Sequence, residues 1–282
     1  MHDSIFSDSW SSNDFMLHVI SRFAPSPTGR LHLGHAWSAL LAHDTARAEN
    51  GRFLLRIEDI DATRCRAEFI DAIYQDLNWL GLTWDGDVML QSRRTAVYRD
   101  ALARLKAMGL VYRCVCTRAE VSENRYPGTC RGLGLTEGAW RLDTAKAIAL
   151  TGPLTWHDRD QGEIAADPLA EGDIVIARKD IGISYHLAVV IDDAAQGITH
   201  VVRGLDLFSA AHVHRLLQAL LGLPTPSYQH HRLIIGSDGT RLAKRKHSPA
   251  LAALREQGIN PQTLIQMMRE QRFPVGFGLA PL

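Results

Sequence analysis

The turn at residues 24–29, Ala-Pro-Ser-Pro-Thr-Gly, most constrains how this chain can fold, because its two prolines exclude a helix there. It separates an apolar segment at residues 17–23, which predicts a strand, from a segment with helical periodicity. In that second segment, apolar and small side chains recur at spacings of three and four between Ala36 and Ala46. A strand that passes through a short turn into a helix is typical of an alternating α/β fold.

The same alternation is found in two further parts of the chain. Residues 53–57 predict a second strand, and helices are expected at about 65–80 and 93–108. The alternation resumes with strands predicted at about 174–178, 184–191, 198–203 and 232–235, and a helix at about 207–221. We therefore expect a parallel, doubly wound, Rossmann-like sheet, followed by two short helices at about 249–257 and 261–271.

Residues 110–173 interrupt this pattern. They hold three of the four cysteines, several prolines and many glycines, with little long periodicity. We interpret the segment as a subdomain inserted into the Rossmann-like domain, which would comprise residues 17–109 and 174–247. Residues 1–16 are expected to form a disordered extension, and residues 248–282 a C-terminal helical segment.

The charge balance limits the kind of partner. Lysine plus arginine and aspartate plus glutamate each number 31, so the formal net charge is zero. Because a protein that wraps a long stretch of tRNA usually carries a basic excess, we expect any RNA footprint to be small and local. No apolar run is long enough to span a bilayer, and the N-terminus lacks the basic region of a signal peptide. Four cysteines in such a chain predict reduced thiols and a cytoplasmic protein without membrane association.

Two motifs indicate binding of a nucleoside triphosphate. Residues 32–35, His-Leu-Gly-His, stand at the start of the first predicted helix, where unpaired backbone amides favour phosphate. Gly34 permits close approach, and His32 and His35 can donate hydrogen bonds to an α-phosphate as its charge develops. Residues 241–245 read Arg-Leu-Ala-Lys-Arg, and Lys244 can stabilise the same triphosphate. Alternatively, the histidines are surface residues of a capped helix and the second motif is a solvated basic loop.

Residues 22–35 and 56–61 resemble the catalytic core of the class I glutamyl-tRNA synthetases, whose two signature motifs match residues 32–35 and 241–245. The resemblance covers about 17–109 and 174–247. It implies a Rossmann-like catalytic domain in which ATP is bound by His32, Gly34, His35 and Lys244, with His32, His35 and Lys244 as catalytic residues. The second motif departs from the family pattern, because Arg241 and Ala243 replace its first lysine and its serine.

Side chains at predicted strand ends suit an amino acid with two carboxylates and one ammonium. Arg22 and Arg203 each end a strand, at the edge where ligands bind in such sheets, and arginine binds carboxylates through paired charge-assisted hydrogen bonds. Glu58 can take the ammonium, and Tyr185 can add a hydroxyl donor. Each residue also has a structural alternative. Arg22 and Arg203 could form surface ion pairs, Glu58 could cap a helix, and Tyr185 could belong to the core. The resemblance implies a glutamate site that contains these four residues and Phe23, Ala24, Pro25 and Ser26.

Three cysteines of the insert suit tetrahedral zinc. Cys114, Cys116 and Cys130 lie within seventeen residues of one another, around a Pro-Gly turn. Tyr126 is the fourth ligand that the resemblance implies, while Glu120, Glu123 or water are alternatives. Three thiols without metal in a small core is the other interpretation. One zinc ion per chain would be structural and would hold the insert that receives the RNA.

Only residues 246–282 follow the basic loop, and we expect them to form two helices and no anticodon-binding domain. Together with the cysteine-bearing insert, this resembles the glutamyl-queuosine tRNA(Asp) synthetases, truncated paralogues of the glutamyl-tRNA synthetase core. The resemblance implies a monomeric ligase that activates L-glutamate with ATP and magnesium, without tRNA. It then transfers glutamate to queuosine in the anticodon loop of tRNA(Asp). A discriminating glutamyl-tRNA synthetase that charges tRNA(Glu) and a catalytically inactive RNA-binding paralogue are the alternatives.

Overall fold

The computed structural model describes residues 18–121, 125–179, 182–240, 242 and 249–281. The predicted extension at residues 1–16 therefore lies outside the described residues, as does the basic motif at 241–245 apart from Leu242. Among the described residues, no helix combines the length and the apolar character that crossing a bilayer requires.

The first half of the central sheet forms as predicted. β1 (Ile20–Phe23) leads through the proline-containing turn into α1 (Leu33–Ala48), and β2 (Arg52–Ile57) is followed by α2 (Ala67–Leu80). β1 pairs in parallel with β2, and β2 pairs in parallel with the short β3 (Met89–Leu90). The predicted strand at 53–57 and helix at 65–80 are thus confirmed.

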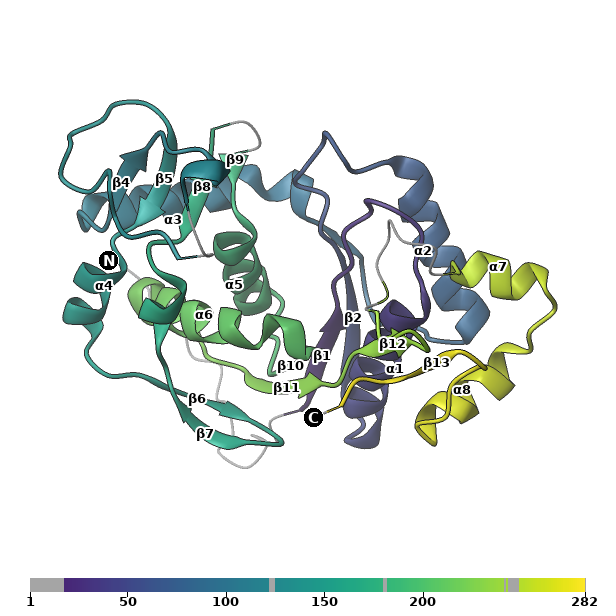
Figure 1. Cartoon of the computed structure of the whole chain (residues 1–282). Coiled ribbons are helices and arrows are strands. Elements are labelled where there is room, and N and C mark those ends of the chain that lie inside the picture. The colour runs from purple at the N-terminus through teal and green to yellow at the C-terminus, as the bar shows by residue number, and fades with distance from the viewer. Residues whose placement is uncertain (1–17, 122–124, 180–181, 241, 243–248, 282) are drawn as a thin grey trace, which may run out of the picture.

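The second half of the sheet lies beside β1. The Thr199 N–H donates to the Ile20 carbonyl at 3.0 Å, which brings β10 (His200–Gly204) alongside β1 (Figure 1). β10 pairs in parallel with β11 (Ser227–His231), which pairs in parallel with β6 (Thr155–Asp158), and β7 (Gly162–Ala165) is antiparallel to β6. The predicted α/β class with a parallel sheet is confirmed.

A separate antiparallel sheet lies at the upper left of Figure 1. Its strands, in spatial order, are β4 (Val111–Cys114), β5 (Ala139–Leu142), β8 (Val175–Arg178) and β9 (Gly182–Ile183). The predicted boundary between residues 173 and 174 falls between β5 and β8, which pair with each other. Strands β6 and β7 of the predicted insert join the central sheet instead, and the division into domains stays a prediction.

The prediction of a strand at residues 184–191 is wrong. Residues 185–191 form the first part of helix α5 (Tyr185–Ala195), which Ser184 directly precedes. The helix packs between α3 (Thr95–Ala107), α6 (Phe208–Leu221) and β8 and is buried from Leu187 to Asp193. A helix that is covered on nearly all sides carries a continuous apolar run, and periodicity alone does not distinguish such a run from a buried strand.

The C-terminal part packs beside the helices that accompany the first half of the central sheet. The predicted short helices are confirmed as α7 (Leu251–Glu256) and α8 (Pro261–Arg269), and α8 contacts α2. The predicted strand at 232–235 is found as β12 (Ile234–Gly236), which pairs with β13 (Phe277–Leu279). Sequence reasoning missed β11 because its residues, Ser-Tyr-Gln-His-His, are mostly polar.

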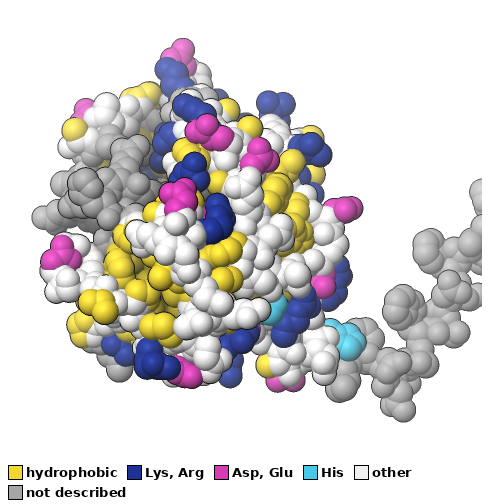
Figure 2. All heavy atoms as spheres, turned by 90° about the vertical axis from the view of Figure 1, so that its right-hand side faces the viewer, with side chains coloured by type: hydrophobic (Ala, Val, Ile, Leu, Met, Phe, Trp, Pro, Cys, Tyr) yellow, Lys and Arg dark blue, Asp and Glu magenta, His cyan; other side chains and the backbone are white. Residues whose placement is uncertain are grey.

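The surface over α7 and α8 shows how the neutral charge balance is distributed. Figure 2 views this face, where basic and acidic side chains are interspersed around apolar ones. No field of a single sign covers the described part of this face, as a net charge of zero leads one to expect.

Candidate functional site

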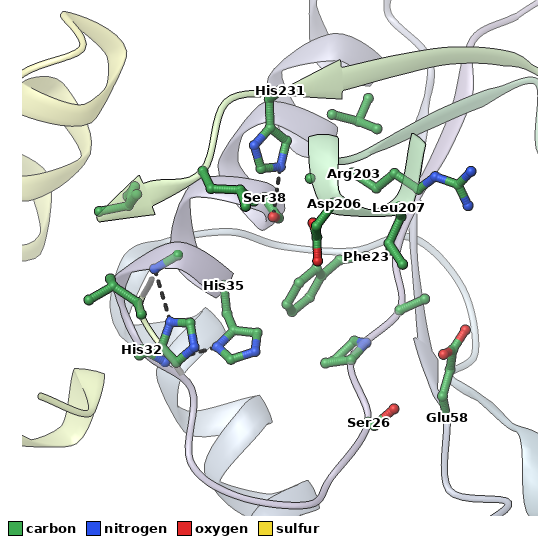
Figure 3. Close-up of a pocket in the computed structure, with 18 of the residues that line it drawn as sticks. Phe23, Ser26, His32, His35, Ser38, Glu58, Arg203, Asp206, Leu207 and His231 are labelled. Carbon is green, nitrogen blue, oxygen red and sulfur yellow. Dashed lines mark hydrogen bonds between the residues drawn. The ribbon is translucent and has the colours of Figure 1, made fainter. Parts of the chain in front are cut away.

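A cavity of about 530 Å³ opens at the carboxyl ends of β1, β2 and β10 (Figure 3). It brings together every predicted nucleotide-binding and glutamate-binding residue except Lys244, which lies outside the described residues. These lining residues are Arg22, Phe23, Ala24, Pro25, Ser26, His32, Gly34, His35, Glu58, Tyr185 and Arg203. Leu242, the one described residue of the basic motif, lines the same cavity. Leu242 therefore lies at this edge of the sheet.

The two motif histidines cap helix α1 and line the cavity at once. The His32 Nδ1 accepts the Gly34 N–H at 3.1 Å, and the His35 Nδ1 accepts the His32 N–H at 3.1 Å. In a neutral ring whose Nδ1 accepts, the proton must reside on Nε2. Capping and ligand binding therefore use different nitrogens, so the capped-helix interpretation and the phosphate interpretation are compatible.

Gly34 keeps the first histidine ring close to the helix. A Cβ atom at this position would lie 3.1 Å from Cε1 and 3.2 Å from Nδ1 of His32. Any larger residue would have to displace the ring that accepts the Gly34 N–H. The glycine thus leaves room for the His32 ring in its capping position.

Arg22 belongs to a buried network of charges. Its Nε donates to Asp193 Oδ1 at 3.0 Å, and Nη1 of the fully buried Arg56 donates to the same oxygen at 2.7 Å. Nη2 of Arg56 also lies 3.3 Å from Glu58 Oε1. Arg22 is therefore ion-paired, but it is buried rather than on the surface, and it lines the cavity.

The same network sets the charge states of its two carboxyl groups. Burial opposes ionisation of Asp193, yet Arg22 and Arg56 hold its pKa below the ordinary value. Burial raises the pKa of Glu58, and the nearby charges of Arg56 and Arg22 only partly offset this. Sequence reasoning missed Arg56 and Asp193 as site residues. A charged residue inside the apolar strand at 53–57 was the available signal for Arg56.

Arg203 has different partners. Its Nε donates to His230 Nε2 at 3.0 Å, its Nη1 donates to His214 Nδ1 at 3.3 Å, and Cζ lies 5.0 Å from the ring centre of Tyr228. The guanidinium is buried, and its Nη2 has no hydrogen-bond partner among the described residues. Nothing in the sequence pointed to the two histidines, which come from β11 and α6.

Tyr185 is the first residue of helix α5 rather than part of a strand, yet it lines the cavity as expected. Burial raises the pKa of its hydroxyl, so it remains a donor at neutral pH. Ser26, Glu58 and Tyr185 also line a second cavity of about 370 Å³ that extends toward Tyr126 of the cysteine loop. The two cavities therefore share a wall.

The three cysteines of the insert come together. The sulfur atoms of Cys114, Cys116 and Cys130 lie within 4.8 Å of one another, and the Tyr126 hydroxyl is 3.6 Å from Cys116 Sγ. That hydroxyl also accepts the Cys130 N–H at 2.8 Å. Its contact with the Cys130 thiol lowers the pKa of that thiol to about 7, so a thiolate forms readily.

This arrangement fits a tetrahedral metal. Zinc bonds of about 2.3 Å to sulfur place two thiolates a little under 4 Å apart, and the Cys116 and Cys130 sulfur atoms are 3.5 Å apart. Tyr126 is the candidate fourth ligand that lies in contact with these sulfurs. The carboxylate of the alternative ligand Glu120 instead accepts from the backbone N–H and the hydroxyl of Thr117. Glu123 lies outside the described residues.

Zinc content provides the first prediction. We expect purified protein to carry about one zinc ion per chain, and Cys130→Ser to lose most of it, because a three-ligand site holds zinc far more weakly. Elemental analysis after dialysis measures this. Cys65→Ser is the matched control, since Cys65 lies outside the cluster. Equal zinc content in the two variants would contradict the assignment.

The buried histidines predict acid sensitivity. Burial lowers the pKa of His186 and of His230 to about 4, and that of His214 well below its ordinary value. Below pH 6.5 these histidines become protonated in the unfolded chain but stay neutral in the folded protein. The free energy of unfolding should therefore fall as the pH drops from 6.5 to 5, by up to about 1.4 kcal/mol per pH unit for each such histidine.

Urea denaturation at pH 7.5, 6.5, 5.8 and 5 measures this dependence. His214→Asn removes one of the rings, so its free energy of unfolding should fall less steeply than that of the wild type. A slope that is the same in both proteins would show that His214 titrates alike in the folded and unfolded states.

The chain was compared with known proteins. Residues 18–133 and 145–276 match the model of the tRNA synthetases class I (E and Q), catalytic domain. The chain is 48% identical to glutamyl-Q tRNA(Asp) synthetase of Rhodobacter capsulatus over 89% of this chain and 99% of that protein. It is 41% identical to glutamate–tRNA ligase of Oleidesulfovibrio alaskensis over 90% of this chain and 57% of that protein.

Solved structures give the same fold. A glutamate tRNA ligase from Elizabethkingia meningosepticum, in complex with its amino acid, superposes with a TM-score of 0.75 at 26% identity. The match covers 90% of this chain and 61% of that chain, so the present chain spans less than two thirds of the ligase.

Proposed function

Since the chain belongs to the class I tRNA synthetases of the glutamyl and glutaminyl group, and is thus a ligase, we propose that it activates glutamate with ATP without tRNA and transfers it to the queuosine of tRNA(Asp). One observation carries the proposal. The histidines that cap α1 and the charged groups Arg22, Glu58 and Arg203 line a single cavity. The name of the relative with 48% identity supports the acceptor.

The first step is adenylation. The α-carboxylate of glutamate attacks the α-phosphorus of ATP, the bond to the β-phosphate bridging oxygen breaks, and glutamyl-adenylate and pyrophosphate form. His32 and His35 would donate from Nε2 to phosphate oxygens whose charge develops in the transition state. Lys244 would act on the same triphosphate, and magnesium is expected with ATP. No protein nucleophile is needed, since these residues act by positioning and electrostatics.

The amino acid would be recognised by the charges around the other end of the cavity. The buried guanidinium of Arg203, whose Nη2 lacks a partner among the described residues, suits a carboxylate of the substrate. Glu58, which contacts Arg56, suits the ammonium group of the substrate. That positive charge would also favour the ionised form of Glu58. Tyr185 supplies a hydroxyl donor. Glutamate has a group for each of these sites.

The second step needs an acceptor hydroxyl close to the activated carbonyl. The second cavity is a candidate for the acceptor nucleoside, because it shares Ser26, Glu58 and Tyr185 with the first. A hydroxyl of the queuosine cyclopentenediol would attack the glutamyl carbonyl, and AMP would leave. Tyr126 lines this cavity, so structural zinc at Cys114, Cys116, Tyr126 and Cys130 would order its wall. We further propose that the protein is a cytoplasmic monomer.

Two assays test the proposal. ATP–pyrophosphate exchange with glutamate should proceed without RNA, and radiolabelled glutamate should then be transferred to tRNA(Asp) that carries queuosine. The same tRNA without queuosine and tRNA(Glu) are the controls. Exchange that strictly requires tRNA(Glu), with labelling of that RNA, would assign the chain instead to glutamate–tRNA ligases, to which it is also 41% identical. Absence of any exchange would indicate an inactive paralogue.

A further inference from the structure

We propose that His214 and His230 are positioning residues that hold the Arg203 guanidinium in place without pairing its charge, so that the cavity selects an amino acid with an anionic side chain over its uncharged amide. The inference rests on the proposed function, because it concerns the glutamate end of the same cavity. It assigns a task to two buried histidines that the adenylation steps leave unused.

The three buried arginines of the site differ in what holds them. Arg22 and Arg56 both donate to Asp193, at 3.0 and 2.7 Å, so a carboxylate already shares their charge. Arg203 forms no salt bridge with any described carboxylate, and its direct partners are two imidazoles and the face of Tyr228. Of the three arginines, Arg203 is the one whose positive charge has no direct counter-ion among the residues that the structure describes.

Arg203 can only donate hydrogen bonds, and this sets both imidazole tautomers. Because His230 accepts from Arg203 at Nε2, its proton must be on Nδ1, which then donates to Asp158 Oδ2 at 2.7 Å. Because His214 accepts from Arg203 at Nδ1, its proton must be on Nε2, which then donates to His186 Nδ1 at 3.2 Å. Each ring is therefore anchored on its far side.

Both rings must be neutral to accept from a cation. Burial and the nearby Arg203 lower the pKa of His214 well below its ordinary value, and burial lowers the pKa of His230 to about 4 although Asp158 opposes this. At neutral pH the rings thus orient the guanidinium and add no charge of their own. Asp158 reaches Arg203 only through the ring of His230, so it occupies none of the hydrogen-bonding positions of the guanidinium.

The consequence is specificity. An arginine that is paired with a protein carboxylate offers little to a second carboxylate, whereas a buried and unpaired arginine must gain a counter-ion to offset its desolvation. A ligand with a side-chain carboxylate supplies that counter-ion, and the corresponding amide does not. Replacing an imidazole beside Arg203 by a carboxylate should therefore abolish the preference, while an uncharged acceptor in the same place should keep it.

His214→Asn and His214→Asp form a matched pair of nearly equal shape for this test. The asparagine oxygen can accept from Arg203 as the imidazole does, and the aspartate adds a negative charge there. In ATP–pyrophosphate exchange we expect the KM for glutamate of the Asp variant to exceed that of the Asn variant by about 30-fold or more. The KM for ATP of the two variants should agree within about twofold. The ratio of kcat/KM for glutamate over glutamine should be about tenfold or more lower in the Asp variant than in the Asn variant.

A purely structural role for His214 predicts that both variants are impaired alike, and that result would overturn the inference. His230→Gln and His230→Glu repeat the comparison at the second ring if the first pair does not fold. In the wild type, ¹⁵N chemical shifts of the two imidazoles should report neutral rings with the assigned tautomers at pH 7, and an imidazolium at either position would also overturn it. Wild-type protein without glutamate-dependent exchange would refute the proposed function itself.

Discussion

Replacement of Arg203 by glutamine is expected to raise the KM for glutamate in the exchange reaction by about 100-fold or more. The guanidinium is buried and has no direct counter-ion in the described part of the chain, so a bound carboxylate gains both charge pairing and hydrogen bonds from it. Glutamine keeps some hydrogen-bonding capacity but no charge. Arg203→Lys should fall between the wild type and Arg203→Gln, because it keeps the charge and loses the planar fork.

The matched control is Arg215→Gln, on the same helix as His214. Arg215 donates to the Thr155 carbonyl at 2.8 Å and does not line the cavity. Its substitution should leave the KM for glutamate within about twofold of the wild type. The KM for ATP should change little in either variant. A glutamate KM that is unchanged in Arg203→Gln would remove Arg203 from the substrate site.

Replacement of Lys244 by alanine should slow pyrophosphate exchange about 100-fold or more, as for the loss of a group that stabilises charge in the transition state. Lys244 lies outside the described residues, but Leu242 of the same motif lines the cavity. Because the lysine would act on the triphosphate, we expect kcat to fall and the KM for glutamate to change little.

Lys106→Ala is the control for this variant. Lys106 lies on α3 and contacts the ring of Trp140, away from the cavity, so its loss removes one positive charge without touching the site. Exchange by Lys106→Ala should match the wild type. A rate for Lys244→Ala that equals the control rate would exclude this lysine from catalysis. It would also strengthen the alternative of a paralogue whose second motif has lost its function.

The groups that could be predicted from the sequence are those whose placement is local. The prolines at 25 and 27 and the glycine at 34 determine a turn and a helix start, and the histidine cap uses bonds that span two or three residues. Arg22 and Glu58 are likewise placed by the ends of their own strands. The clustering of Cys114, Cys116 and Cys130 needs only one loop to close. Such patterns are readable because short spacings determine the geometry.

The helix α5 and the strand β11 could not be predicted from local sequence patterns. An apolar run that is buried on most sides suits either element, and only the neighbours of residues 184–191 decide for a helix. β11 is polar because its histidines face buried partners rather than solvent, and this inverts the usual signal for a strand.

By itself, the sequence determined that a capped helix start, two arginines and a glutamate would meet at the edge of a parallel sheet, since these follow from local turns and strand ends. Only the tertiary structure decided which arginine is paired. Arg22 is bonded to Asp193, which lies 171 residues away in the sequence, and Arg203 is bonded to His230, which lies 27 residues away. The physical reason is that the net effect of a buried charge depends on its contacts after folding, and long-range packing selects those contacts.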